Sequence, residues 1–422
     1  MLKNSKNLRL TISLKKFFPF FLLEIIITST TGSLGTAISN NIISELNYAP
    51  WIGGIVVSMA SAGFLIFTLA FGHISDKYGQ RNVIIIILFI RLGCSFFYLV
   101  PITSNLHLII FGLLFFIDGG VSGLFWPTIQ QISVLTEKFG GLRLKQRYMS
   151  GYNFSWNFGF IFGMIGGAII VYLFNSNYSV FYFNAIWLIF GVVIALFFVK
   201  NTYEIFKTDK KSVNDSQQTI IKEFNDELIR DGQLSITSRL SRLPLYSLLL
   251  VLLLHSSTDG VMVIFLTLKV DLIHQELYWV FLLTLVKLFS QMVATMIFSF
   301  TKKKQIARLL MISIAVVAFS WFLIMLSNDL WSLALLLTIS GFGQGMIYPL
   351  IMNLISYKAR DKNSAKPFSY FQAIMSSGRM TGSLMIGLTS TVFLNLGVVI
   401  ILVYEILTYI QFNINWKYTS RD

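Results

Sequence analysis

Six ionisable residues stand inside long apolar stretches of this sequence: Glu24, Asp118, His255, Asp259, Lys287 and Arg379. An ionisable side chain in such surroundings is costly, and it usually faces a hydrated cavity or a partner of opposite charge. Carboxylates and a histidine can take up and release protons, whereas lysine and arginine can hold an anionic or zwitterionic group. These residue types therefore support proton exchange and ion pairing with a small molecule.

Polar residues near these charges recur at the spacing of one helical face. Residues three or four apart on a helix lie above one another on the same side. The stripes are Glu24, Thr28 and Thr31; Asp118, Ser122 and Trp126; His255 and Asp259; Thr284, Lys287 and Gln291; and Ser376, Arg379 and Ser383. An internal salt bridge could explain any single residue, but the set favours a hydrated binding cavity.

Aromatic and amide side chains are further candidates for the wall of such a cavity, because they can stack on a ring or form hydrogen bonds with a solute. The candidates are Trp126, Tyr152, Asn157, Gln291, Gln344 and Tyr348. Aromatic residues make up 15% of the chain, so most of them are expected in packing or at the membrane interface. The sequence predicts no metal site and no cofactor.

The pair His255 and Asp259 gives a specific hypothesis about proton exchange. The two residues stand one helical turn apart, so together they would hold one proton more easily than two or none. Asp259, like Asp118 and Glu24, could then carry a coupling proton. The alternative is that Asp259 forms an ion pair with Lys287 or Arg379, in which case its loss would leave a buried base unpaired.

The composition excludes an ordinary soluble domain. Of 422 residues, 55% are hydrophobic and 12% are charged, and the mean hydropathy is +0.71. A soluble domain has about 25% charged residues, and about 20 apolar residues suffice for one helix to cross a membrane. The sequence predicts an all-α polytopic membrane protein with twelve transmembrane helices, at 17–43, 52–71, 83–101, 107–134, 149–172, 178–199, 244–268, 277–300, 308–327, 330–356, 367–393 and 395–415.

The net charge of +14 follows the predicted topology. With the N-terminus placed in the cytoplasm, 29 of the 33 Lys and Arg residues fall in cytoplasmic segments. Positive residues concentrate on the cytoplasmic side of membrane proteins, so both termini are expected there, in the plasma (cell) membrane. The charge is therefore a topology signal, and a nucleic-acid partner is excluded.

A polar segment divides the predicted helices into two similar groups of six. The sequence predicts an N-terminal bundle at 1–200, a cytoplasmic linker with a possible amphipathic helix at 201–243, and a C-terminal bundle at 244–422. The stretches GGVSGLFWP and GFGQGMIYP, which start at Gly119 and Gly341, share glycines, an aromatic residue and a proline at a constant offset of 222 residues. Such pairs of six-helix pseudo-repeats build one large class of transporters.

The loop between the second and third spans, GHISDKYGQR, interrupts two apolar runs with two glycines and three charges. Its residues Gly72, Asp76, Lys77, Gly79 and Arg81 resemble the signature loop of the major facilitator superfamily, G-x-x-x-D-[RK]-x-G-R-[RK]-[RK], although Gln80 and Asn82 replace basic residues. The corresponding loop of the second half, FTKKKQIAR, has neither the acid nor the glycines. The twelve spans and the paired repeats extend the resemblance over the whole chain.

The resemblance implies roles for several charges. In this family the acid of the loop helps to latch the two halves together on the cytoplasmic side, so Asp76 is expected to act as a conformational gate. Spans three, six, nine and twelve stand outside the cavity in the family. Arg91 and Glu405 are therefore expected to be paired or snorkelling structural charges.

The sequence predicts a secondary active transporter that moves a small solute by alternating access, coupled to H⁺ with Na⁺ as the alternative ion. A drug or metabolite efflux antiporter of the same fold and a transport-dead sensor or receptor are the competing functions. Enzymatic activity is not expected, because no phosphate-binding glycine loop, metal cluster or nucleophile triad is present. The expected partners are the solute, the ion and the lipid bilayer, and the protein is expected to be monomeric.

Overall fold

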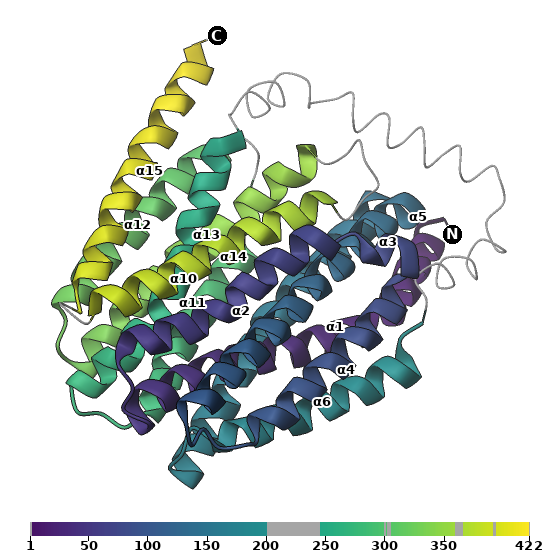
Figure 1. Cartoon of the computed structure of the whole chain (residues 1–422). Helices are drawn as coiled ribbons and strands as arrows, with labels where there is room; N and C mark the ends of the chain where they lie inside the picture. Colours follow the sequence, from purple (N-terminus) through teal and green to yellow (C-terminus); the bar gives the residue numbers. More distant parts are fainter. Residues whose placement is uncertain are drawn as a thin grey trace.

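The computed structural model describes residues 2–200, 245–298, 301, 305–358, 366–390 and 394–421, and within them the chain is helical and contains no strand (Figure 1). The first half contains α1 (Leu2–Asn40), the π-helical turn η1 (Asn41–Glu45), α2 (Pro50–Phe71), α3 (Ile74–Tyr78), α4 (Gln80–Tyr98), α5 (Asn105–Phe174) and α6 (Ser179–Phe198). The second half contains α10 (Leu245–Leu272), α11 (Tyr278–Phe298), α12 (Ile306–Leu326), α13 (Leu330–Lys358), α14 (Lys366–Ser390) and α15 (Leu396–Arg421). The predicted amphipathic helix of segment 201–243 lies outside the described residues.

The expected all-α membrane fold is confirmed. Eleven stretches of the described chain are long and apolar enough to cross a membrane. The remaining long helix, α14, corresponds to the predicted span 367–393 and is more polar, because Gln372, Ser376 and Arg379 face a central cavity. Both chain ends lie on the same side of the bundle (Figure 1). That side is called the termini side below, and the opposite one the far side.

Helix α5 contains two of the predicted spans. Its backbone stays helical from Asn105 to Phe174, whereas the sequence predicts separate spans at 107–134 and 149–172. The Tyr148 hydroxyl nevertheless donates a hydrogen bond to the Ile129 carbonyl at 3.1 Å. A straight helix would separate these residues by about 29 Å. The chain therefore reverses direction through a helical connection, and the two spans pack side by side.

The two repeated glycine stretches make equivalent contacts in the two halves. A Cβ atom on Gly119 of α5 would lie 2.1 Å from the Ala60 carbonyl oxygen of α2, and one on Gly341 of α13 would lie 2.3 Å from the Lys287 carbonyl oxygen of α11. Each glycine thus lets the fourth span of its half pack directly against the second span. The repeat seen in the sequence corresponds to a repeat in packing.

Candidate functional site

A cavity of about 210 Å³ lies between the two halves. Its wall is formed by α1, α2, α4, α5, α10, α11, α13 and α14. The sequence-predicted candidates on this wall are Asp118, Trp126, Asp259, Lys287, Gln291, Tyr348 and Arg379. The candidates that do not line it are Glu24, Tyr152, Asn157, His255 and Gln344. The structure therefore brings together the charged residues of spans four, seven, eight and eleven.

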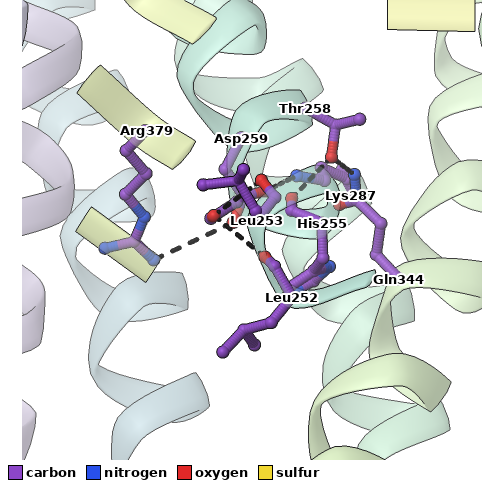
Figure 2. Close-up of polar contacts among 9 residues, drawn as sticks. Leu252, Leu253, His255, Thr258, Asp259, Lys287, Gln344 and Arg379 are labelled. Carbon is purple, nitrogen blue, oxygen red and sulfur yellow. Dashed lines mark hydrogen bonds and ion pairs between the residues drawn. The ribbon is translucent and has the colours of Figure 1, made fainter. Parts of the chain in front are cut away.

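Asp259 is the centre of the charge cluster in the second half (Figure 2). Its Oδ1 atom lies 2.5 Å from the Lys287 Nζ atom, and its Oδ2 atom lies 3.8 Å from an Nη atom of Arg379. The side chain of Lys287 is 3% exposed, whereas that of Arg379 is 31% exposed. One carboxylate thus stands between two cations, and the buried lysine makes the closer contact.

The contacts of Asp259 with Lys287 and Arg379 correspond to the ion pair that the sequence leaves open as the alternative to a proton shared with His255. The two ring nitrogens of His255, one turn away on α10, are buried and have no hydrogen-bond partner in the described part of the chain. Close to them, Gln344 donates to the Thr258 hydroxyl at 2.5 Å, and Thr258 donates to the His255 carbonyl at 2.6 Å (Figure 2). The shared proton of His255 and Asp259 stays a prediction.

The first half holds a second buried ion pair on the cavity wall. The Arg91 Nε atom of α4 donates to Asp118 Oδ1 of α5 at 2.8 Å, and the two side chains are 1% and 5% exposed. The sequence predicts a paired charge at Arg91 but places its span outside the cavity. The long arginine side chain reaches the cavity from α4. Glu405 of α15 is also buried, but its carboxyl has no hydrogen-bond partner among the described residues.

Aromatic residues of the two halves meet on the termini side of the cavity. Trp156 of α5 and Tyr348 of α13 stack across the two halves, with ring centroids 5.1 Å apart and an angle of 17° between the planes. Trp126 contacts Tyr152 edge to face at 6.4 Å, and the Tyr152 hydroxyl accepts a hydrogen bond from Gln130 at 2.9 Å. Tyr152 thus lies behind the cavity wall and positions Trp126.

Glu24 lies beyond this aromatic layer. Its carboxyl is fully buried, and neither oxygen has a hydrogen-bond partner among the described residues. Its electrostatic neighbours are the tyrosines Tyr148, Tyr152 and Tyr348. A carboxylate in such a position would lack the counter-ion that a buried charge requires. Asn157, another predicted wall residue, instead donates to the Asn153 carbonyl of its own helix at 2.7 Å.

The signature loop is held to the first half by side-chain hydrogen bonds. The Gln131 amide group donates to Asp76, and its Oε1 atom accepts from Ser75 and from Gln80, both at 3.0 Å. The Arg81 guanidinium donates to the carbonyls of Val199 and Leu196 at the end of α6, and Lys77 lies over the Tyr78 ring. Sequence reasoning missed Gln131, because an amide at the end of an apolar span carries no signal of its partner.

Glycine is favoured at the two positions of the loop for different structural reasons. Gly79 has φ 80°, a left-handed backbone conformation that favours glycine, at the turn between α3 and α4. A Cβ atom on Gly72 would lie 2.3 Å from the Ser369 hydroxyl of α14, so glycine permits close contact with the other half. The loop therefore lies at the junction of the halves on the termini side.

The halves also meet on the far side of the cavity. The hydroxyl groups of Ser39 in α1 and Thr267 in α10 lie 3.1 Å apart, and Thr267 donates to the Asn40 side chain at 2.7 Å. Phe281 of α11 packs on Gly167 of α5. Contacts between the halves are thus present on both sides, and the cavity lies between them.

Two six-helix halves around a charged central cavity define a membrane transport protein. The chain belongs to the major facilitator superfamily, whose model matches residues 20–383. This match confirms the resemblance seen in the signature loop and the repeats. No curated protein matches the sequence.

Solved transporters share the fold at low sequence identity. The xylose transporter XylE from E. coli, in a partially occluded inward-open conformation, is 14% identical with a TM-score of 0.70, over 94% of this chain and 96% of its own. The nucleoside transporter NupG is 16% identical with a TM-score of 0.63, over 96% and 99%. The human organic anion transporter MFSD10 is 15% identical with a TM-score of 0.62, over 95% and 98%. These similarities show that this chain has the same fold as the three transporters.

Proposed function

We propose that this protein is a secondary transporter that moves a small solute by alternating access, coupled to a proton. The observation that carries the proposal is a central cavity whose described wall holds three cations and two carboxylates drawn from both halves. Ionisable residues at such depth mark substrate and proton pathways, because their burial is costly for stability alone. The fold and family support membrane transport.

Alternating access requires the two sides to open in turn. On the far side, contacts such as Ser39 with Thr267 separate. On the termini side, the stack of Trp156 on Tyr348 separates, together with the contact of Gly72 with Ser369. Asp76 lies in the loop beside this second junction, and we assign it the gating role implied by the family.

Glu24 is the proposed proton carrier. Asp118 and Asp259 each contact a cation, so each has a counter-ion for its charge. Glu24 has no such partner among the described residues, so protonation removes the cost of burying its charge. When the termini side opens, water reaching the layer below Trp156 and Tyr348 could exchange this proton.

The topology proposal follows the positive residues. We place the termini side in the cytoplasm, because the basic segments of the sequence fall on that side. The proposed location is the plasma membrane. The described residues of a single chain form the cavity, which supports a monomeric transporter.

Uptake into proteoliposomes tests the proposal. Purified protein is reconstituted, a pH gradient is imposed in either direction, and solutes accumulated from a total metabolite extract are identified by mass spectrometry against protein-free liposomes. We expect pH-driven accumulation of at least one solute. Accumulation driven by a Na⁺ gradient alone would contradict proton coupling. Absence of accumulation under every gradient would contradict transport and favour a receptor function.

A further inference from the structure

The charges on the cavity wall do not balance. Arg91, Lys287 and Arg379 face Asp118 and Asp259, so the described lining carries one positive charge in excess. An excess charge in a cavity walled by protein is less well solvated than in bulk water, and a solute of opposite charge would offset this cost. The cavity therefore favours a solute with a single negative charge.

Arg379 is the cation with the weakest partner. Arg91 and Lys287 contact carboxylates at 2.8 and 2.5 Å, and both are almost fully buried. Arg379 lies 3.8 Å from Asp259, beyond hydrogen-bond distance, and it donates no hydrogen bond within the described part of the chain. Its guanidinium has five N–H donors in a planar arrangement that fits a carboxylate or phosphate. Figure 2 shows Arg379 on the side of Asp259 opposite the buried network of Thr258 and Gln344.

Other polar atoms of the wall also lack partners. The Gln291 Oε1 atom, the Ser122 hydroxyl and one Nη atom of Arg91 are buried and have no hydrogen bond among the described residues. Gln291 and Ser122 are 2% and 3% exposed. The carbonyl oxygen of Gln291 accepts hydrogen bonds only, so a hydroxyl or N–H group on the solute fits it.

The volume of the cavity limits the size of the solute. The cavity has a volume of about 210 Å³, below the range of roughly 300–1,000 Å³ that is typical of ligand pockets, so it favours a small solute. Trp126, Phe64 and Phe160 line the same space and give it apolar surface for the carbon skeleton. The site thus combines one cationic end, polar groups without partners and an apolar wall.

We infer that the transported solute is a small organic monoanion with at least one hydroxyl or N–H donor, and that Arg379 binds its acidic group. This inference rests on the proposed transport function. It names the chemical class of the solute, which neither the fold nor the family defines.

The test compares three variants in the proteoliposome assay with a total metabolite extract. Arg379→Gln removes the charge, Arg379→Lys keeps it, and Arg308→Gln is a matched control at an exposed position of α12. We expect the unmodified protein and the control to accumulate monoanions, Arg379→Gln to lose them, and Arg379→Lys to retain part of the uptake. Lys287 still pairs with Asp259 in Arg379→Gln, so the melting temperature of this variant should stay close to that of the control.

The methyl ester of an accumulated acid gives a second readout on the unmodified protein and on Arg379→Lys, which retain uptake. The ester keeps the carbon skeleton and loses the charge, so on the unmodified protein it should compete about tenfold to a hundredfold less well than the acid, and Arg379→Lys should narrow this difference. Accumulation of neutral or cationic solutes, unchanged in Arg379→Gln, would overturn the inference and leave the transport function standing. Absence of any accumulation would overturn the transport function, and the inference with it.

Discussion

Substitution of Asp259 by asparagine tests whether the ion pair with Lys287 holds the second half together. Asparagine has nearly the same shape, so the change removes the negative charge and little volume. Lys287, 3% exposed, would then remain buried with Arg379 as its charged neighbour and no counter-ion among the described contacts. We expect the variant to be markedly less stable than the unmodified protein.

The magnitude follows from the two distances. At 2.5 Å and an effective dielectric constant of about 20, the attraction between Asp259 and Lys287 is about 7 kcal/mol. The cost of removing both charges from water offsets part of it, and breaking one side of such a buried pair destabilises proteins by about 3–5 kcal/mol. The contact with Arg379, at 3.8 Å with a 31% exposed side chain, contributes about 1 kcal/mol or less.

The assay is thermal unfolding in detergent, followed by tryptophan fluorescence, on three proteins. Asp259→Asn should melt well below the unmodified protein, and the double variant Asp259→Asn with Lys287→Met should recover most of the loss, because it leaves no buried lysine charge. A single variant as stable as the unmodified protein would refute the reasoning. If that stable variant also lost pH-driven accumulation but kept exchange, the shared proton of His255 and Asp259 would be favoured instead.

Three further substitutions test separate parts of the structure. Asp118→Asn should lower the free energy of unfolding by about 3–5 kcal/mol in the same assay, because it leaves the buried Arg91 without its counter-ion. An unchanged melting temperature would argue against the ion pair of Arg91 with Asp118. Glu24→Gln should keep counterflow exchange and abolish pH-driven accumulation in proteoliposomes; retained accumulation would exclude Glu24 as the proton carrier. Asp76→Asn should insert normally and slow transport without loss of solute affinity, and unchanged kinetics would count against a gate.

The helices and most of the charged cavity residues could be predicted from the sequence. Long apolar runs fix the spans, and charges inside them are costly enough that Asp118, Asp259, Lys287 and Arg379 had to face a cavity or one another. Their pairing could not be predicted, because it depends on which helices are neighbours and how each is rotated. Arg91 shows this limit, since its span is peripheral in the family pattern and only the reach of its side chain brings it to the cavity.

Some local features also need three-dimensional information. The helical connection inside α5 contains glycines and charges that read as a loop in the sequence. The contacts of Gln131 with Asp76, Ser75 and Gln80 join segments about fifty residues apart, and no spacing rule relates them. Glu24 was visible as a buried acid, but its lack of a partner depends on the tyrosines that surround it.

The most direct test of alternating access is a reversible cross-link on the far side. Ser39 and Thr267 belong to opposite halves, and their hydroxyl groups lie 3.1 Å apart, so cysteines at these positions should form a disulfide. Cys94, the single native cysteine, is buried and can be replaced by alanine. Solute accumulation in proteoliposomes is then measured in the oxidised and reduced states of the same sample. Our account predicts that the oxidised protein stops transporting and that reduction restores it; full transport by a completely cross-linked protein would contradict the account.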